Sequence, residues 1–173
     1  GYYSKTKENQ MVNEMTYSDD KAKVWELAEK IDFCMLVTRS GEDYRSRPMS
    51  THIDKSDGSF LFLTSVDDYK DDEIARDPNV NLAFADNKAM KYLSVSGKAS
   101  LLNDREKIKD LWSVPAKAFW DSPEDPSIRI LKVVPSSAEY WDSPGKIVSM
   151  IKMAAAAVSD SKPDLGDNVK VTL

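Results

Sequence analysis

The sequence is poor in the residues that build disulfides, zinc sites and histidine-rich active sites. It contains one cysteine, Cys34, and one histidine, His52. A single cysteine excludes an internal disulfide framework and a multi-cysteine zinc site, and a single histidine excludes a histidine metal cluster. We therefore expect no metal site. Cys34 lies in a dense apolar run, so we interpret it as a core residue.

Long apolar runs and an excess of basic charge are also missing. No stretch approaches the ~20 apolar residues of a membrane span. At the N-terminus no basic region is followed by an apolar region, so we expect no secretory signal. Lysine and arginine number 24 against 29 acidic residues, which gives a net charge of −5. This balance argues against nucleic acid, since phosphate backbones are held by clustered basic side chains. We expect a cytoplasmic protein with neither a membrane nor a nucleic-acid partner.

The length of the chain allows one hydrophobic core rather than two. It has 173 residues, of which 41% are hydrophobic, and no internal repeat or interdomain linker is recognisable. We predict a flexible N-terminal segment over 1–17 and a single domain over 18–158. The polar tail, 159–173, is expected to be poorly ordered.

Short apolar runs with a two-residue alternation dominate the middle of the chain and predict about six strands. These cover residues 33–38, 44–53, 60–64, 80–85, 92–101 and 128–134, with a further one at 137–141. Helices are predicted at 19–31, 69–77, 104–112 and 145–158. The strands follow one another through short turns rather than crossover helices. This order favours a mainly β (α+β) fold, an antiparallel barrel with peripheral helices.

The first candidate site is the run RSRPMS at residues 45–50. Arg45 and Arg47 are two residues apart, so an extended strand places both on one face. Two guanidinium groups on one face point to a bound phosphate or carboxylate, because arginine matches such oxygens bidentately. The alternative is a pair of exposed arginines that form salt bridges with nearby acids, and the spacing alone favours it.

The second candidate site is a strand end followed by a predicted helix start. Its residues are Leu63, Thr64, Ser65, Tyr69 and Lys70. Hydroxyl donors, a helix N-terminus and a lysine together can cradle a phosphate. An ordinary strand-to-helix connection, capped by Ser65 or Asp67, explains the same residues equally well.

Aromatic residues form the third group, in the C-terminal half. The group consists of Trp112, Phe119, Trp120, Tyr140 and Trp141. Tryptophan can stack on a planar heterocycle, although most tryptophans simply bury area in cores or interfaces. Trp120 lies in the loop from Pro115 to Pro123 and can close over a ligand. His52 can serve as a haem ligand or a proton donor, but a lone histidine is more often a satisfied polar residue.

The order of these motifs resembles one known family. The resemblance rests on RSRPMS at 45–50, FLFLTS at 60–65, DPNVNLAFAD at 77–86, YLSVSGKASL at 92–101 and EYWDSP at 139–144. These are similar to the general stress protein 26 group of the pyridoxamine 5′-phosphate oxidase-like, FMN-binding split-barrel superfamily. The resemblance covers about residues 20–158. It implies a six-stranded Greek-key split β-barrel and a homodimer with flavin sites at the subunit interface.

The resemblance also implies which residues bind the flavin. They are Arg47, Pro48, Met49, Ser50, Leu63, Thr64, Ser65, Tyr69, Lys70, Trp112, Trp120 and Trp141. Arg47 and Lys70 are expected at the phosphate, together with Ser65 and Tyr69. Leu63 and Thr64 are expected against the isoalloxazine ring and the ribityl chain. The tryptophans match aromatic positions that flank the ring, in part from the partner subunit.

The chain departs from the true oxidases in two places. Their C-terminal arginine-and-histidine substrate motif is missing, because His52 is the only histidine and residues 159–173 contain no arginine. Oxidation of vitamin B6 is therefore not expected. Tyr69 stands where the oxidases commonly carry arginine, which removes one positive charge and weakens FMN binding.

The sequence therefore predicts a stress-related flavin-dependent oxidoreductase that binds FMN non-covalently. A small-molecule electron donor or acceptor is expected, and no residue stands out as a catalytic acid or base. The first alternative is a non-enzymatic flavin-binding or sensor module. The second is a different cofactor on the same barrel, either haem through His52 or a deazaflavin.

Overall fold

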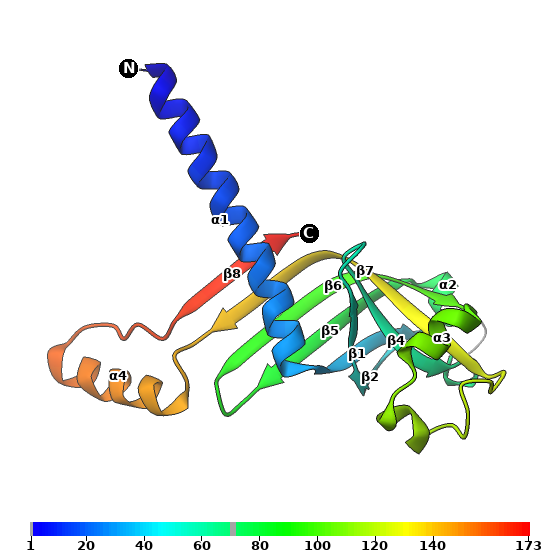
Figure 1. The fold of residues 1–173 in the computed structure, drawn as a ribbon. Coiled ribbons are helices and arrows are strands. Elements are labelled where there is room, and N and C mark those ends of the chain that lie inside the picture. The colour runs from blue at the N-terminus through cyan, green and yellow to red at the C-terminus, as the bar shows by residue number, and fades with distance from the viewer. Residues whose placement is uncertain (1, 70–71) are drawn as a thin grey trace. The chain divides into compact units, whose positions relative to one another are not determined.

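The computed structural model describes residues 2–69 and 72–173 (Figure 1). In chain order its elements are α1 (Tyr2–Ile31), β1 (Phe33–Ser40), β2 (Asp43–Ser50), β3 (His52–Asp54), β4 (Ser59–Ser65), the 3₁₀ helix η1 (Val66–Asp68), α2 (Glu73–Arg76), β5 (Asn79–Asp86), β6 (Lys91–Leu102), α3 (Arg105–Leu111), the 3₁₀ helix η2 (Val114–Ala118), β7 (Ile128–Asp142), α4 (Lys146–Ser159) and β8 (Asp167–Thr172).

The strands join into one mainly antiparallel sheet, which confirms the predicted α+β split-barrel class. Over the described residues the hydrogen-bonded order is β2-β1-β5-β6-β7-β4-β3, with β8 added beside β7. The sheet thus has eight strands where about six were predicted. The predicted strand 44–53 is divided at Thr51 into β2 and β3, whereas 128–134 and 137–141 are parts of the single strand β7.

The two ends of the sheet are joined by a single residue. The strands β2 and β3 occupy opposite ends of the strand order, yet only Thr51 separates them in sequence. Consecutive Cα atoms are about 3.8 Å apart, so Ser50 and His52 must lie close together. The sheet therefore curls until its end strands meet at this point, which leaves a seam between β2 and β3.

The chain folds into two compact units, each assembled from separate segments. Unit 1 comprises residues 1–31, 84–94 and 137–173, and unit 2 comprises 32–83 and 95–136. The strands β5, β6 and β7 each contribute residues to both units.

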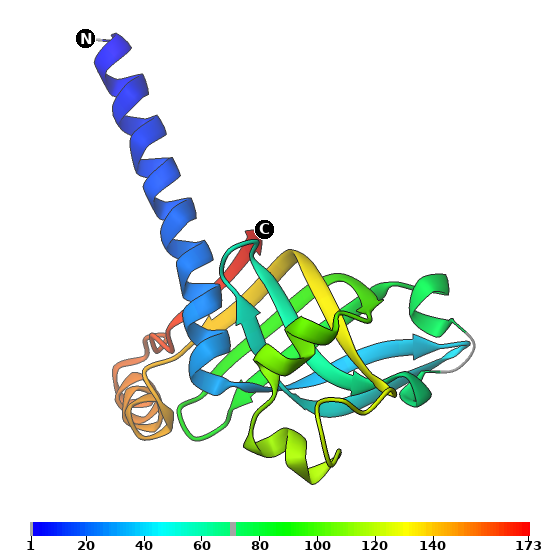
Figure 2. The same cartoon turned by 45° about the vertical axis from the view of Figure 1, so that its right-hand side comes forward.

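Unit 2 is built around β4, whose residues are buried on both faces of the strand. Leu61 packs with Ile108 of α3 and with Ile128 and Ile130 of β7. Phe60 and Phe62 point to the opposite face and are also fully buried. Figure 2 shows α3 lying over this part of the sheet. Burial on both faces explains why this strand reads as a continuous apolar run rather than an alternating one.

Gly97 marks a close approach between two strands of unit 2. A Cβ atom at this position of β6 would lie 2.5 Å from the carbonyl oxygen of Val134 and 3.0 Å from the Cα of Pro135. No side chain fits at such distances. The proximity of the β7 backbone therefore gives the physical reason for a glycine inside this strand.

Unit 1 contains the first helix, which is longer than predicted. The predicted face of Val24, Leu27 and Ala28 is buried. However, the helix begins at Tyr2 rather than near residue 19, and it runs through the segment for which flexibility was predicted. That segment contains no proline or glycine after Gly1, and lysine, glutamate, glutamine and methionine within it favour helix.

The C-terminal tail is the second correction in unit 1. Residues 167–172 form β8, which pairs antiparallel with 137–142 of β7, and Val171 is buried. Figure 1 shows β8 beside α1. The alternation of Val169 and Val171 between polar residues was the available strand signal. Among the described residues, no helix is both long and apolar enough to cross a membrane.

Candidate functional site

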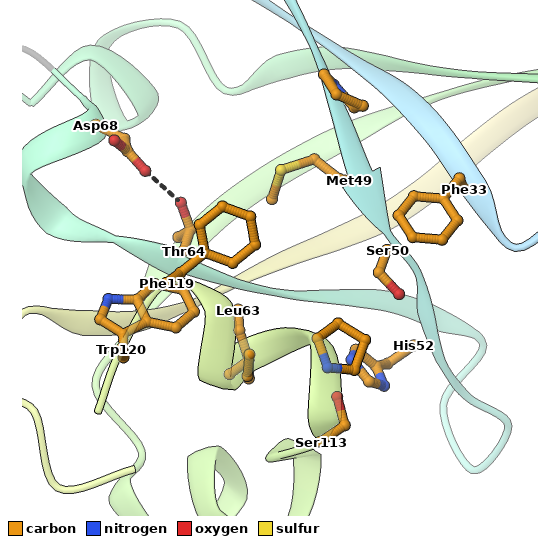
Figure 3. Close-up of a pocket in the computed structure, with 13 residues that line it drawn as sticks. Phe33, Met49, Ser50, His52, Leu63, Thr64, Asp68, Ser113, Phe119 and Trp120 are labelled. Atoms are coloured by element: carbon orange, nitrogen blue, oxygen red, sulfur yellow. Dashed lines mark hydrogen bonds between the residues drawn. The ribbon is translucent and has the colours of Figure 1, made fainter. Parts of the chain in front are cut away.

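A cavity of about 200 Å³ opens in unit 2 along the seam of the sheet (Figure 3). It is lined by Phe33, Pro48, Met49, Ser50, His52, Leu63, Thr64, Asp68, Ser113, Pro115, Ala116, Phe119 and Trp120. Ser50 and His52 flank the one-residue connection between the two ends of the sheet. The cavity therefore lies where the curled sheet fails to close.

Two separate runs predicted as binding sites meet in this cavity. Pro48, Met49 and Ser50 come from the end of β2, and Leu63 and Thr64 come from the end of β4. In Figure 3 the Met49 and Ser50 side chains lie across the cavity from Thr64 and Leu63. Their roles toward a ligand remain predictions, but they line one cavity.

The 3₁₀ helix η2 and the residues after it supply an aromatic wall. Trp120 lines the cavity as the loop position suggested, and its ring centroid lies 5.9 Å from that of Phe119 at an interplanar angle of 56°. Phe119 and Phe33 also line the cavity although both side chains are largely exposed. Phe119 belongs to the aromatic group that the sequence singled out. Sequence reasoning missed Phe33, because nothing in its local pattern separates an exposed aromatic from a core one.

Arg47 is a half-buried cation without a carboxylate partner. Its Nη1 and Nη2 atoms each donate a hydrogen bond to Thr38 Oγ1 at 3.0 Å. The buried Nε atom has no hydrogen-bond partner. Within residues 2–69 and 72–173, no carboxylate forms an ion pair with Arg47. A buried donor and an uncompensated charge together make this position suited to an anion.

Arg45 follows the same strand face as Arg47, as the alternation predicted. Its Nη1 atom donates to the backbone carbonyl oxygen of Asp68 at 3.0 Å, while the Arg47 guanidinium lies 5.2 Å from the centroid of the Tyr69 ring. Both side chains thus reach the same segment. Salt bridges to nearby acids, the alternative reading of the two arginines, are not observed in the described part of the chain.

Tyr69 connects Arg47 to the cavity. The hydroxyl of Thr64, which lines the cavity, donates to Tyr69 Oη at 3.2 Å and lies 3.4 Å from Asp68 Oδ2 (Figure 3). Burial raises the pKa of Tyr69, against the opposing effects of Thr64 and Arg47. The phenol is therefore neutral at physiological pH and can act as a hydrogen-bond donor or acceptor beside the cation.

The rest of the predicted phosphate cradle differs from expectation. Ser65 accepts a hydrogen bond from the backbone of Asp67 and forms a capping box with Asp68, which is the ordinary connection weighed above. The predicted helix at 69–77 is confined to Glu73–Arg76, and Tyr69 is extended. Lys70 lies outside the described residues. Of the two cationic residues predicted at the phosphate, Arg47 is the one that the structure describes.

Two of the predicted tryptophans do not line the cavity. Trp112 packs against the apolar cluster formed by α3 and β7. Trp141 belongs to unit 1, on β7, where it pairs with Asn168 of β8. Trp120 is the one that the structure brings together with the two runs on β2 and β4.

His52 and Cys34 have contrasting environments. Burial lowers the pKa of His52, with Asp32 acting in the opposite direction, so a neutral imidazole lines the cavity at pH 7. Burial raises the pKa of Cys34 to about 11, which keeps it an inert core thiol. The described residues contain no group of histidine, cysteine and acidic side chains arranged to hold a metal ion.

The antiparallel sheet is curled, its cavity lies at the seam, and Arg47 forms no ion pair among the described residues. These features indicate a small split-barrel protein. The chain belongs to the pyridoxamine 5′-phosphate oxidase like family, whose model matches residues 19–164. The resemblance read from the ordered motifs is therefore confirmed.

Individual relatives agree with this family. General stress protein 26 of Bacillus subtilis is 28% identical over 133 residues, which cover 75% of this chain and 93% of that protein. The crystal structure of a general stress protein 26 from Jannaschia sp. CCS1 matches with a TM-score of 0.70 and 26% identity, over 91% of this chain and 99% of the other. The general stress FMN/FAD binding protein of Xanthomonas citri shares the fold, with a TM-score of 0.61 and 24% identity, over 69% of this chain and 86% of that one.

Proposed function

We propose that this protein binds FMN non-covalently in the cavity of unit 2 and acts as a flavin-dependent oxidoreductase. The observation that carries the proposal is the half-buried Arg47, which has an unpaired Nε and no carboxylate partner among the described residues. A phosphate supplies the missing acceptor and charge. The family and the Xanthomonas relative, whose name records FMN or FAD binding, support a flavin as the source of that phosphate.

The other residues of the cavity fit the remaining parts of FMN. Met49 and Leu63 offer apolar surface to the isoalloxazine ring, and Trp120 offers an aromatic face. Ser50 and Thr64 offer hydroxyl groups to polar edges of the ring or to the ribityl chain. Lys70, predicted from the sequence alone, would add a second positive charge at the phosphate. Bound FMN supplies the hydride or electron chemistry, while the chain anchors, orients and shields it.

We also propose that the site is completed by a second copy of the chain. The cavity volume of about 200 Å³ is below the ~300–1,000 Å³ of typical small-molecule sites. One chain would therefore cover FMN only in part. A homodimer would cover the rest and leave room for a small-molecule electron donor or acceptor.

The direct test is an absorbance spectrum of the purified protein, recorded alone and after incubation with FMN and gel filtration. We expect two flavin bands to stay with the protein, and riboflavin, which lacks the phosphate, to bind much more weakly. A protein that retains no flavin would contradict the proposal. Flavin that stays bound but is reduced by no nicotinamide or quinol donor would replace the oxidoreductase by a flavin-binding module.

Substitution of Arg47 tests the phosphate assignment. Arg47→Ala together with Lys70→Ala should weaken FMN binding by about 2–5 kcal/mol, because two charge-assisted contacts are lost. Riboflavin binding should change little. Arg45→Ala is the matched control, because this arginine is engaged by the Asp68 carbonyl and should matter far less. Unchanged FMN affinity in the double variant would remove the phosphate from this position.

A further inference from the structure

Two polar side chains of the cavity have no role in the proposed flavin site. They are His52, at the start of β3, and Ser113, immediately before η2. Over the described part of the chain, neither side chain forms a hydrogen bond or an ion pair with another group. Small-molecule sites typically combine apolar walls with a few such polar groups, which fix the orientation of the ligand. We call this pair the polar corner of the cavity.

The hydroxyl of Ser113 is available to a ligand because it does not cap the helix that follows it. A serine before a helix usually accepts a hydrogen bond from a backbone N–H of the first turn. Ser113 has an extended backbone, with φ −145° and ψ 174°, and its side chain makes no such bond. In Figure 3 this hydroxyl points toward the end of the cavity where the His52 ring lies.

The position of His52 follows from strand pairing. His52 is opposite Leu61 of β4, and residues directly opposite each other in an antiparallel pair place their side chains on the same face. Leu61 packs against α3 and β7, so the imidazole lies on the face of β4 that α3 covers. Burial lowers the pKa of His52, with Asp32 acting in the opposite direction. In the neutral ring one nitrogen donates a hydrogen bond and the other accepts one.

The polar corner favours a ligand with an oxygen atom that accepts hydrogen bonds. An apolar group placed there would remove the imidazole N–H and the Ser113 hydroxyl from water without replacing their hydrogen bonds, which is unfavourable. A carbonyl oxygen has two lone pairs, so it can accept from both groups at once. A carbonyl at the edge of the ligand is therefore the matching group.

The charge of the cavity wall disfavours an anionic ligand. None of the described residues that line the cavity is lysine or arginine, and the one carboxylate among them is Asp68. An anion that leaves water needs a compensating charge, which these residues do not offer. The same argument disfavours a nicotinamide dinucleotide, because its two phosphates need basic side chains. We therefore expect the carbonyl to belong to an uncharged molecule.

The walls beside the polar corner suit a flat apolar ring. Pro115 and Ala116 follow Ser113 in the chain and line the same cavity. Phe33 and Phe119 also line it, although they are 55% and 78% exposed. Aromatic side chains stack on planar rings, and covering exposed aromatic surface stabilises a complex. Quinones combine a planar, uncharged ring with carbonyl oxygens at its edge.

We propose that His52 and Ser113 bind a carbonyl oxygen of a neutral quinone, which is the electron acceptor of this protein. The inference rests on the proposed flavin function. The quinone is reduced to its quinol as it takes a hydride from the reduced flavin, which is oxidised, and a proton from solvent. His52 and Ser113 bind and orient the quinone, and they thereby set the specificity for the acceptor.

The first experiment adds duroquinone to the FMN-loaded, oxidised protein. The methyl groups of duroquinone leave no free ring position to which a thiol could add. Because His52 is the only histidine of the chain, the imidazole signals in proton NMR report on the polar corner alone. We expect duroquinone to shift them in a saturable manner. The matched probe is 2,3,5,6-tetramethylbenzoate, which carries a carboxylate on a similar methylated ring and should bind about tenfold more weakly or worse.

The second experiment removes the two hydrogen-bonding groups one at a time and measures duroquinone binding by calorimetry. Ser113→Ala should weaken binding by about three- to tenfold, and so should His52→Phe, which keeps a flat ring without nitrogens. His52→Gln keeps a donor and should recover part of the loss. All three variants should retain FMN, and dioxygen should reoxidise their flavin at the parent rate. The control is Ser100→Ala, an exposed position of β6 outside the cavity, which should change neither binding nor reoxidation.

Three results would overturn the inference. The first is unchanged imidazole signals, or unchanged duroquinone affinity in Ser113→Ala and His52→Phe, in protein that retains FMN; the proposed function would then stand. The second is loss of FMN itself in these variants, which would assign the polar corner to the flavin. The third is tetramethylbenzoate binding as tightly as duroquinone. A parent protein that retains no FMN would instead contradict the proposed function, and duroquinone binding that depends on His52 in that protein would support the carbonyl site without its redox role.

Discussion

Thr38 is a buried hydroxyl that holds both terminal nitrogens of Arg47. Replacing it by valine keeps the shape but leaves the guanidinium without its acceptor. We expect Thr38→Val to lower the free energy of unfolding by about 1–3 kcal/mol and to weaken FMN binding, as measured by urea denaturation and flavin titration. Thr51→Val is the control, because its hydroxyl donates only a 3.6 Å contact to Cys34 Sγ. Equal losses in both variants would contradict this role for Thr38.

His52 is expected to make the free energy of unfolding depend on pH. Burial lowers the pKa of His52 in the folded protein below the ordinary value of 6.5. Its neutral form therefore contributes stability that is fully present above pH 6.5 and is lost as the pH falls through the folded pKa. Because the chain has one histidine, a single imidazole signal in proton NMR reports that pKa directly.

The matching stability experiment uses His52→Gln. The parent should lose stability between pH 7 and pH 5, and the variant should lose less over the same interval. A histidine signal that titrates at or above pH 6.5 would contradict the prediction.

The residues of the candidate site that belong to the ends of β2 and β4 were predictable. Met49 and Thr64 stand at strand ends beside recognisable motifs, so pattern and resemblance both pointed to them. Asp68 was not predictable, because it reaches the cavity through the path of the irregular segment that follows β4. Local sequence patterns carry the period of a strand but not the direction of a loop.

At the scale of elements, the contact between β6 and β7 depends on Gly97. A methyl group there would meet the Val134 carbonyl oxygen at 2.5 Å, and backbone cannot move aside as a side chain can. We expect Gly97→Ala to lower the free energy of unfolding by about 2 kcal/mol or more, measured by chemical denaturation. The control is Gly41→Asn, where φ is +63° and no atom lies within 4 Å. Asparagine tolerates this conformation, so the control should stay within about 1 kcal/mol. Similar losses at both positions would refute the steric explanation.

The elements that were predicted well have a strong hydrophobic period, and those predicted poorly do not. The strand β4 and the helix α4 were found within one or two residues of their bounds. The start of α1 and the strand β8 were missed, because polar residues dominate both segments. For β8 the partner strand and the burial of Val171, rather than local propensity, decide the structure.

At the scale of the whole molecule, Asp142 joins segments far apart in sequence within unit 1. Its carboxylate lies 3.0 Å from Lys23 of α1 and also binds Lys91. Burial alone would raise the pKa of Asp142, but the hydrogen bonds from Lys91 and Lys23 outweigh it and hold the pKa below its usual value. The ionised form therefore stabilises the fold above about pH 4, and this contribution is lost as the pH falls through the folded pKa.

We expect Asp142→Asn to lower the free energy of unfolding by about 1–3 kcal/mol at pH 7. The difference from the parent should shrink at pH 3, where the parent carboxyl is partly protonated. Asp164→Asn is the control, because that carboxylate is mostly exposed and 3.9 Å from Lys152, and it should have little effect. Denaturation curves at the two pH values decide the matter, and a difference that does not change with pH would argue against the charge as its cause.

The hydrogen bond between Asp20 and Tyr140 spans 120 residues, and this distance has a consequence for synthesis. A ribosome adds about 5–20 residues per second, so α1 waits roughly 6–24 s before Tyr140 and Asp142 are made. During translation the helix is thus a nascent segment without its polar partners. The native contacts of α1 with β7 therefore form only after about 120 further residues have been made, so unit 1 is completed later than unit 2, which ends at Ser136.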